Sequence, residues 1–265
     1  MSEATLAKEK ISEENYIQVE NVNKYYLRGD EKMPILQNVS FSVAKGEMVC
    51  IVGASGCGKS TLLRAIAGLD PAYEGVIKVN GQPVVKPEKS RGIVFQEHRL
   101  FPWMTVRQNI MYGLSKMDKK TKKQLVDQHI NLVRLNGFEN SYPRQLSGGM
   151  AQRAGIARAL VNNPPVLLLD EPFGALDTFT KINMQRELKR IQKESKTTMI
   201  LVTHDIDEAV FLADKVIVFT SRPGKIEATI NVELPETDGN FRDRNSIEFL
   251  NVRRRIYDLF FKENK

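Results

Sequence analysis

Cysteine and long hydrophobic runs are both scarce in this chain of 265 residues. The two cysteines, Cys50 and Cys57, are too few for a disulfide framework, and they lack the C-x-x-C spacing or the nearby histidines of a zinc site. No apolar run approaches the roughly 18 residues that a membrane-spanning helix needs. Residues 1–15 are polar and mixed in charge, unlike a secretory signal, so we interpret them as a flexible leader. These absences favour reduced thiols in the cytoplasm.

The net charge of +7 is not concentrated in one part of the chain. Two basic clusters stand out, Lys119–Lys120 with Lys122–Lys123 and Arg253–Arg255. Neither is interleaved with the aromatic side chains on which single-stranded nucleic acids stack. An acidic membrane surface would also attract such clusters, but solvated helix faces explain both of them. We therefore predict no nucleic-acid partner.

Residues 53–60 read Gly-Ala-Ser-Gly-Cys-Gly-Lys-Ser and match the phosphate-loop pattern G-x-x-x-x-G-K-[ST] at every fixed position. Residues 48–52 before them are apolar and β-branched, as in a buried strand, and residues 61–67 have apolar positions at helical spacing. A glycine-rich turn that binds nothing is the alternative. The strand before the motif and the helix after it are the context that a phosphate-binding loop requires.

The residue types of this loop explain the predicted chemistry. Gly53, Gly56 and Gly58 allow backbone conformations that a β-carbon would oppose. The loop N–H groups and the following helix N-terminus then offer donors and partial positive charge to an anion. We expect Lys59 to reach the β and γ phosphates and Ser60 to place its hydroxyl on Mg²⁺. The predicted nucleotide-binding residues of the loop are Gly53, Ala54, Ser55, Gly56, Cys57, Gly58, Lys59, Ser60 and Thr61. The thiol of Cys57 is expected to lie near the nucleotide.

Strands and helices alternate along most of the chain. Alternating or apolar runs predict strands at 17–22, 36–43, 48–52, 75–81, 92–95, 166–169, 198–202 and 216–219. The stretch 105–163 is mainly helical, and a further helix is predicted over 178–195. This order predicts an α/β fold with a mostly parallel sheet, an antiparallel β patch near the N-terminus and an inserted helical subdomain.

Two further motifs carry chemistry. The strand 166–169 ends in Asp170 and Glu171. An Asp in this place could hold Mg²⁺, and Glu171, which points the opposite way if the strand continues, could polarise the attacking water. A solvated acidic turn is the alternative. The second motif is Leu146-Ser147-Gly148-Gly149, which opens a helix with a good cap and exposed N–H groups, and so forms a second anion-binding helix N-terminus. A bare capping motif would look the same.

The phosphate loop, the Leu-Ser-Gly-Gly motif and the acidic strand, in this order along the chain, resemble the ATP-binding-cassette (ABC) ATPase family. The resemblance implies that Gln96 reaches Mg²⁺ and the attacking water and that His204 contacts the γ phosphate. It also matches residues 175–177 to the family's D-loop and places Tyr26 against adenine, with Tyr25 as the alternative. Met150 departs from the family, which more often has Gln there. The implied catalytic residues are Glu171, His204 and Gln96, the implied metal ligands are Ser60, Gln96 and Asp170, and the implied cofactors are ATP and Mg²⁺.

The resemblance also implies how the chain is divided into domains and how two copies assemble. Residues 16–222 correspond to the phosphate-loop (RecA-like) ABC domain, with a core at about 16–95 and 165–222 and the helical insertion at about 97–163. Residues 223–265 form a tail with a closing helix over 242–261. Two copies would meet head to tail, so that Ser147, Gly148 and Gly149 of one copy contact the ATP on the phosphate loop of the other.

Two local stretches resemble one branch of the ABC ATPase family. Residues 95–106, with Leu100-Phe101-Pro102-Trp103, and residues 221–226, Ser-Arg-Pro-Gly-Lys-Ile, resemble the nitrate, sulfonate and taurine importer ATPases. The implied role is a peripheral subunit on the cytoplasmic face of the membrane, with integral permease subunits and, indirectly, a solute-binding protein as partners. The aromatic cluster near Trp103 is expected to dock the permease, although a buried core loop would also explain it.

Other functions stay open. The ATPase could serve uptake of a vitamin precursor of the pyrimidine type, or it could power an exporter. A non-transport ABC factor acting on DNA or ribosomes would show ATPase activity stimulated by nucleic acid. A regulatory binding module would lack turnover, which Glu171 and His204 argue against. The solute itself cannot be deduced from this chain.

Overall fold

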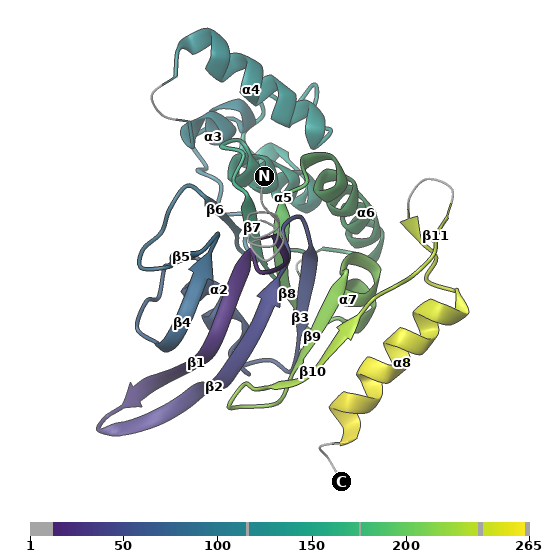
Figure 1. Ribbon diagram of the computed structural model, residues 1–265. Helices are drawn as coiled ribbons and strands as arrows, with labels where there is room; N and C mark the ends of the chain where they lie inside the picture. The colour runs from purple at the N-terminus through teal and green to yellow at the C-terminus, as the bar shows by residue number, and fades with distance from the viewer. Residues whose placement is uncertain (1–12, 115–116, 175, 238–240, 263–265) are drawn as a thin grey trace, which may run out of the picture. The chain divides into compact units, whose positions relative to one another are not determined.

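The computed structural model describes residues 13–114, 117–174, 176–237 and 241–262 (Figure 1). The chain forms two compact units, which we call unit 1 (Met1–Glu88 and Thr198–Lys265) and unit 2 (Lys89–Thr197). Within the described ranges, no helix is both long and apolar enough to pass through a bilayer. Most of the leader predicted at residues 1–15 lies outside the described residues, and the predicted domain boundaries stay predictions.

Unit 1 begins with an antiparallel sheet in the order β2 (Glu31–Val43), β1 (Ile17–Arg28), β4 (Glu74–Val79), β5 (Gln82–Pro83). Ile17 lies opposite Val43 of one neighbour and Val79 of the other. Ile17, Val19 and Val22 are buried while polar residues between them face outward. This alternation is typical of an antiparallel sheet that covers a core with one face, and it confirms the predicted antiparallel patch.

The second sheet of unit 1 contains, in order, β10 (Ile226–Asn231), β9 (Lys215–Phe219), β3 (Met48–Val52) and β8 (Thr198–Thr203). β3 runs parallel to both neighbours, and every residue of β3 and β8 is buried. Continuous apolar runs of this kind suit parallel strands that are covered on both faces. The register places Val52 beside Thr203 and Val218, so the chain leaves these strands at one edge of the sheet. Helix α2 (Lys59–Ile66) follows β3, and helix α7 (Ile206–Leu212) follows β8.

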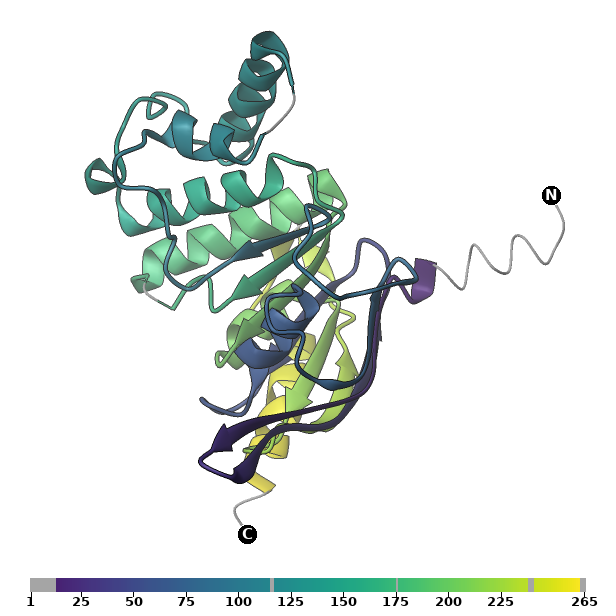
Figure 2. The same ribbon diagram turned by 90° about the vertical axis from the view of Figure 1, so that its left-hand side faces the viewer.

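Unit 2 contains the helical stretch and two parallel strands. The strands are β6 (Arg91–Val94) and β7 (Val166–Asp170), and Val94 lies beside Leu169. The helices are α3 (Val106–Tyr112), α4 (Lys119–Leu132), the short 3₁₀ helix η1 (Pro143–Gln145), α5 (Gly148–Leu160) and α6 (Thr178–Ser195). Helix α5 contacts α3, α4, α6 and β6, and Figure 2 shows α5 and α6 side by side. The predicted bounds of α6 are confirmed.

The C-terminal part of unit 1 differs from the prediction in two places. Strand β10 was not expected, and the tail helix predicted over 242–261 is α8 (Ile247–Lys262). The helix starts later because Arg242 belongs to the short strand β12 (Phe241–Arg242), which pairs with β11 (Glu236–Thr237). The Ser246 side chain then accepts a hydrogen bond from the Phe249 N–H at 3.2 Å, as a helix cap does.

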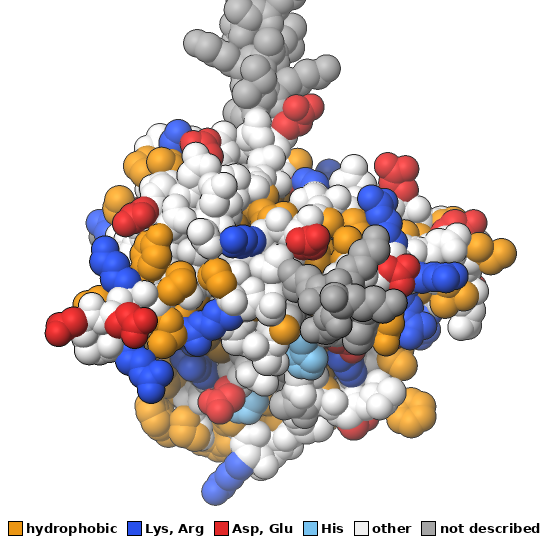
Figure 3. All heavy atoms as spheres, turned by 90° about the horizontal axis from the view of Figure 1, so that it is seen from below, with side chains coloured by type: hydrophobic (Ala, Val, Ile, Leu, Met, Phe, Trp, Pro, Cys, Tyr) orange, Lys and Arg blue, Asp and Glu red, His pale blue; other side chains and the backbone are white. Residues whose placement is uncertain are grey.

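The mixture of a largely parallel sheet, an antiparallel sheet and helices confirms the predicted α/β class. On the face drawn in Figure 3, the basic and acidic side chains of the described residues are interspersed. Lys119, Lys120 and Lys123 are exposed at the start of α4, as expected for a solvated helix face.

Candidate active site

The phosphate-loop motif connects β3 to α2 in unit 1, and two of its glycines are required by packing. A β-carbon on Gly53 would lie 2.9 Å from Cys57 Sγ and 3.0 Å from Phe219 Cβ. Gly58 has a φ of 105°, which disfavours any other residue, and a β-carbon there would lie 2.9 Å from the Ile35 carbonyl oxygen. The loop therefore folds tightly against β2 and β9. Ala54, Ser55 and Gly56 are exposed on its outer side.

Lys59 is the first residue of α2 and is only 4% exposed. Its ammonium group donates hydrogen bonds to the carbonyl oxygens of Gly53 and Ala54, each at 2.8 Å. Burying a charge is costly unless it is hydrogen-bonded, so these two bonds hold the side chain across the loop. The positive charge is thus placed at the base of the loop.

The loop fits the phosphates of a nucleotide. Gly58, the cap residue of α2, has no side chain that could accept from the first N–H groups of the helix. These groups and the Lys59 ammonium provide donors and positive charge at one place, which is what a polyphosphate requires. Ser60, next in the helix, supplies a hydroxyl of the type that ligates Mg²⁺ in such loops.

The expectation that the Cys57 thiol lies beside the nucleotide stays a prediction, and the structure shows where this side chain lies in the loop. Cys57 is 1% exposed, and its Sγ accepts from Lys59 Nζ at 3.8 Å. Its close approach to Gly53 shows that the thiol fills the inside of the loop. The side chain therefore packs inside the loop, where it supports the loop conformation.

His204 follows strand β8 and is exposed. Thr203, the last residue of the strand, accepts the Asp205 N–H on its hydroxyl at 3.0 Å. Asp205 in turn caps α7 by accepting the Glu208 N–H at 3.1 Å. Because Thr203 lies beside Val52 in the register, His204 and Gly53 leave neighbouring parallel strands at the same edge. Unit 1 therefore brings His204 and the phosphate loop to the same edge of this sheet.

The aromatic side chain predicted to stack on adenine lies near the end of β1. Tyr26 is 43% exposed, and its hydroxyl donates to Asp70 Oδ2 at 3.3 Å. Lys24, which is buried, pairs with Asp70 Oδ1 at 2.5 Å and lies 5.2 Å from the centre of the Tyr26 ring. The ion pair fixes the carboxylate to which the Tyr26 hydroxyl donates, at the tip of this side chain. The sequence analysis did not predict the Lys24–Asp70 ion pair, because the two residues are far apart in the chain.

Unit 2 positions Gln96, Asp170 and Glu171. The parallel pairing of β6 with β7 brings the residues after Val94 and Leu169 to one edge. Asp170 is 8% exposed. A β-carbon on Gly174 would lie 3.2 Å from Gln96 Nε2 and 3.8 Å from Glu171 Oε2, so both side chains converge on this glycine. Gln96 and Glu171 thus lie about one glycine, and the buried Asp170 immediately precedes Glu171 in the chain.

A turn, and not strand alternation, sets the backbone of Glu171. Its side chain would point away from that of Asp170 if the strand continued. Strand β7 ends at Asp170, and Glu171 has a left-handed φ of 45°. A non-glycine residue rarely adopts this conformation, which costs roughly 1–2 kcal/mol.

The Leu-Ser-Gly-Gly motif opens α5. Ser147 is exposed and accepts the Met150 N–H at 3.3 Å, so it caps the helix as predicted. A β-carbon on Gly149 would lie 2.5 Å from Thr180 Cγ2 of α6. Because this contact leaves no room for a side chain, the glycine allows the two helices to pack. Met150 contributes its backbone to the cap, which agrees with a replaceable side chain at that position.

The start of α6 is fixed by Asp177 of the predicted D-loop. Its carboxylate accepts the Thr180 N–H at 3.1 Å. Hydrogen bonds from the Thr180 hydroxyl and N–H hold the pKa of Asp177 below its ordinary value. Gly148 lies near Leu176, since a β-carbon on it would approach Leu176 Cδ2 to 3.4 Å. The motif and the D-loop are therefore neighbours in unit 2, while Ala175 lies outside the described residues.

The comparison with known families agrees with this arrangement. Residues 36–174, which include the phosphate loop, the Leu-Ser-Gly-Gly motif and Asp170, match the family described as "ABC transporter". The chain belongs to the ABC transporter family.

Named relatives cover nearly the whole ABC chain. The aliphatic sulfonates import ATP-binding protein SsuB of Bacillus cereus is 48% identical over 92% of this chain and 95% of its own. The SsuB protein of Bacillus subtilis (strain 168) is 49% identical over 90% and 92%. The nitrate import ATP-binding protein NrtD of Synechocystis sp. (strain ATCC 27184 / PCC 6803 / Kazusa) is 45% identical over 86% and 87%.

A solved ABC structure is also similar. It is the dimeric structure of a post-hydrolysis state of the ATP-binding cassette MJ0796 bound to ADP and Pi. Its TM-score is 0.71 at 33% identity, and the match covers 82% of this chain and 99% of that one. The phosphate-loop fold predicted from the sequence is confirmed.

A groove of about 440 Å³ on unit 2 of this ABC protein involves the aromatic cluster. Trp103 is 69% exposed and Tyr112 is 63% exposed, and the Phe101 ring lies 5.6 Å and 4.6 Å from their ring centres. The buried-core alternative is therefore wrong for Trp103, although it holds for Leu100. The groove is lined by Trp103, Met104, Gln108, Met111, Tyr112 and Leu114.

Asn109, which is fully buried, fixes the loop beside this groove. Its side chain accepts the Phe101 N–H at 2.8 Å and donates to the Met104 and Thr105 carbonyls at 3.0 and 3.1 Å. Arg158 of α5 donates to the His98 carbonyl at 3.1 Å. Burial, with a smaller effect of Arg158, lowers the pKa of His98. Hydrogen bonds from Asn109 and Arg158 thus hold the loop that follows Gln96.

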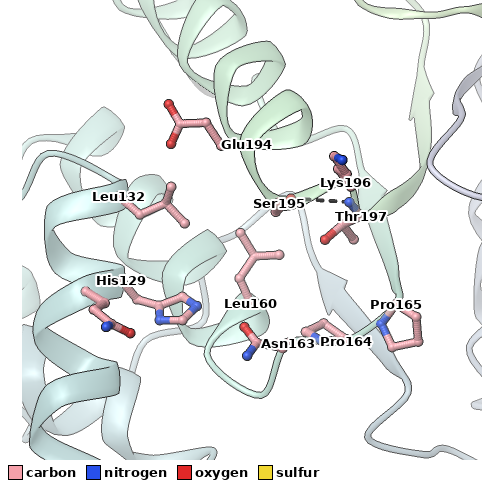
Figure 4. Close-up of a pocket in the computed structure, with 11 residues that line it drawn as sticks. His129, Leu132, Leu160, Asn163, Pro164, Pro165, Glu194, Ser195, Lys196 and Thr197 are labelled. Atoms are coloured by element: carbon pink, nitrogen blue, oxygen red, sulfur yellow. Dashed lines mark hydrogen bonds between the residues drawn. The ribbon is translucent and has the colours of Figure 1, made fainter.

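A second pocket of about 390 Å³ lies at the other end of β7 (Figure 4). Pro164 and Pro165 precede the strand there, whereas Asp170 ends it. His129 points into the pocket, and its Nδ1 donates to the Leu125 carbonyl at 2.8 Å. A five-residue strand spans about 16 Å. This pocket is therefore separate from Asp170, which lies at the opposite end of β7. Among the described residues, no group of three or more His, Cys, Asp or Glu side chains could hold a metal by itself.

Proposed function

We propose that this chain is the ATP-hydrolysing subunit of an ABC importer, which couples ATP binding and hydrolysis to solute uptake through separate permease subunits. The observation that carries the proposal is the near full-length similarity to import ATP-binding proteins, at 48% identity to an SsuB protein. The preformed phosphate loop with its buried Lys59 supports the same conclusion.

The solute is proposed to be of the sulfonate, taurine or nitrate type. The relatives named above are import proteins for aliphatic sulfonates and for nitrate. They do not favour uptake of a pyrimidine-type precursor or a non-transport role. The choice of solute would rest with a binding protein and the permease, which are proposed as partners of this subunit.

The loop residues 53–61 are proposed to hold the nucleotide phosphates, with Lys59 on the β and γ phosphates and Tyr26 against adenine. Mg²⁺, when bound, would neutralise the charge that develops on the transferred phosphoryl group. Ser60, Gln96 and Asp170 are the residues proposed to hold it. A hydroxyl, an amide and a carboxylate provide the oxygen ligands that this ion prefers.

The proposed chemistry of hydrolysis assigns a separate task to three side chains. Glu171 takes the proton from the attacking water at a carboxylate oxygen. Gln96 orients that water, and this role is supported by its proximity to Glu171 about Gly174. His204 donates a hydrogen bond to the γ phosphate, and its place beside the phosphate loop supports this role.

Two copies are proposed to meet head to tail. Ser147, Gly148 and Gly149 of one copy would then contact the nucleotide on the phosphate loop of the other, and two-fold symmetry makes both sites alike. The solved neighbour of 33% identity is described as dimeric. ATP would favour the closed dimer to the extent that it binds this state better.

Growth and uptake measurements test this function. In cells that lack the chain, we expect loss of growth on an alkanesulfonate as sole sulfur source or on nitrate as sole nitrogen source, and loss of labelled uptake of that solute. The native chain should restore both, and Lys59→Ala should restore neither. Unchanged uptake of sulfonates, taurine and nitrate in the deletion would refute the proposed solute class. Nucleic-acid-stimulated ATPase activity would instead favour the non-transport alternative.

A further inference from the structure

Helix α7 follows His204 directly, and its position therefore decides where this histidine lies. The helix has seven residues, Ile206–Leu212. Isolated helices shorter than about 12 residues are marginal in water, so α7 depends on its surroundings. Its N-terminal end is capped by Asp205, one residue after His204. Any movement of the helix axis would pass to His204 through this single residue.

The C-terminal end of α7 is capped by Arg242, a residue of β12 far along the chain. Its guanidinium group donates to the carbonyl oxygen of Val210 at 2.9 Å and to those of Phe211 and Ala213. The second terminal nitrogen donates to the Val232 carbonyl at 3.2 Å. The last carbonyls of a helix have no partner within it, and a cation there also favours the helix dipole. The Arg242 side chain is only 7% exposed.

Two further arginines of the C-terminal segment contact α7. The Arg244 guanidinium lies 4.5 Å from the centre of the Phe211 ring. Arg253 of α8 pairs with Asp207, in the first turn of α7, at 2.9 Å. Phe249 and Ile256 of α8 are buried, and α8 packs against α7 (Figure 1). Arg242, Arg244 and helix α8, which we call the C-terminal segment, therefore hold α7 at both of its ends.

We propose that Arg242 is a positioning residue for His204, and that the C-terminal segment sets the rate of hydrolysis through helix α7. This inference rests on the proposed role of His204 at the γ phosphate. Without Arg242, the last turn of α7 loses the donor for three carbonyl groups and the helix shifts, so His204 leaves its place at the edge of β8. Arg253 acts in the same direction but weakly, because its ion pair with Asp207 is half exposed.

Steady-state kinetics provide the first test. Arg242→Ala should lower kcat for ATP hydrolysis about tenfold. A misplacement of the reacting groups by 1 Å can cost roughly hundredfold in rate, and we expect a smaller displacement of His204. The KM for ATP should stay within about twofold of the native value. Arg242→Lys should lower kcat less, since an ammonium keeps the charge but lacks the planar fork of donors. Arg254→Ala, an exposed neighbour of Arg253, is the matched control and should keep native kinetics. A native kcat in Arg242→Ala would overturn the proposal.

A double-variant cycle separates positioning from general damage. If Arg242 acts through His204, Arg242→Ala should change the single-turnover rate less than about twofold in a His204→Ala background. Equal losses in both backgrounds would overturn this inference and leave the importer function standing. A His204→Ala variant with native turnover would instead refute the proposed role of His204, and this inference with it.

Histidine resonances give a readout that does not depend on activity. The chain has three histidines, His98, His129 and His204, so each ring Cε1–H signal can be assigned by a single substitution. In Arg242→Lys and Arg242→Ala, the His204 signal should move while those of His98 and His129 stay. A variant that fails to fold would move all three, which identifies it. A folded Arg242→Ala with an unmoved His204 signal would contradict the proposal.

Discussion

Asp170 and Glu171 are consecutive carboxylates with different surroundings. Asp170 is buried at the end of β7, whereas Glu171 turns out of the strand through a left-handed conformation. Glu171 Oε2 thereby lies near Gly174 and the Gln96 side chain. Two equivalent carboxylates would compete for one task, but this geometry allows one to hold a metal and the other to accept a proton.

Glu171→Gln should keep ATP binding and nearly abolish turnover, because the amide cannot accept the proton from water. Loss of a general base usually costs about 10² to 10⁴ in rate. The variant should accumulate as an ATP-bound dimer, which light scattering would detect. A Glu171→Gln enzyme that hydrolyses at more than half the native rate would rule out this role.

Lys59→Ala should remove nucleotide affinity and turnover together, because it deletes the charge that the phosphates meet and the two bonds that brace the loop. Hydrogen bonds to charged groups contribute roughly 1.5–3 kcal/mol. Fluorescent-ATP binding is the measurement. Arg64→Ala, on the exposed side of the same helix, is the control and should bind normally. Tight binding by Lys59→Ala would contradict the site.

At the scale of elements, the contact between α5 and α6 depends on one glycine. Gly149→Ala should lower the stability of unit 2 by about 1–3 kcal/mol, the usual cost of overpacking, because the new methyl group would overlap Thr180 Cγ2. Thermal unfolding measures this loss. Thr180→Ser removes that methyl group and keeps the hydroxyl near Asp177, so it should restore stability in the double variant.

Gly148→Ala is the matched control for this contact, since its β-carbon would meet Leu176 at an ordinary 3.4 Å. It should not lower the melting temperature. If Gly149→Ala melts at the native temperature, or if Thr180→Ser fails to rescue it, then the close approach of the helices is not what requires the glycine.

Elements with local signals could be predicted from the sequence. The bounds of β3 follow from an apolar run, the helix predicted over 178–195 matches α6, and the phosphate loop is contiguous in the chain. Arg242 could not be predicted, because its partners are backbone carbonyls of distant residues that leave no mark in the sequence. The Lys24–Asp70 pair was missed for the same reason. Strand β10 was missed although Ile226, Ala228 and Ile230 alternate with polar residues. A functional site can be predicted from the sequence where the residues that act together are also neighbours in the chain.

At the scale of the whole molecule, the aromatic groove of unit 2 is the proposed contact with the permease. Trp103 projects from a loop that Asn109 holds rigidly, so it can enter a partner's surface without ordering a flexible segment. Large aromatic anchors of this kind are typical of binding hot spots. The loop begins after Gln96, so a partner seated in the groove would contact a segment that continues into the catalytic cluster.

Trp103→Ala should leave the isolated subunit folded and its basal ATPase rate within about twofold, while weakening assembly with the permease by roughly 2 kcal/mol or more. Co-purification measures assembly, and circular dichroism checks the fold. Tyr257→Ala, which alters an exposed aromatic residue on α8, should assemble normally. A folded Trp103→Ala that assembles and transports like the native chain would end the docking proposal.

The bonds from Lys59 to the Gly53 and Ala54 carbonyls have a consequence for how the nucleotide arrives. Immobilising a lysine side chain costs roughly 1.5–2 kcal/mol of conformational entropy. Here the side chain is already ordered by folding, so this cost does not fall on the binding step. The incoming phosphates need only exchange places with carbonyl oxygens at an ammonium group that is already aimed. Part of the nucleotide affinity therefore depends on the stability of the fold. A substitution that destabilises unit 1 elsewhere should lower both the free energy of unfolding and the affinity for nucleotide.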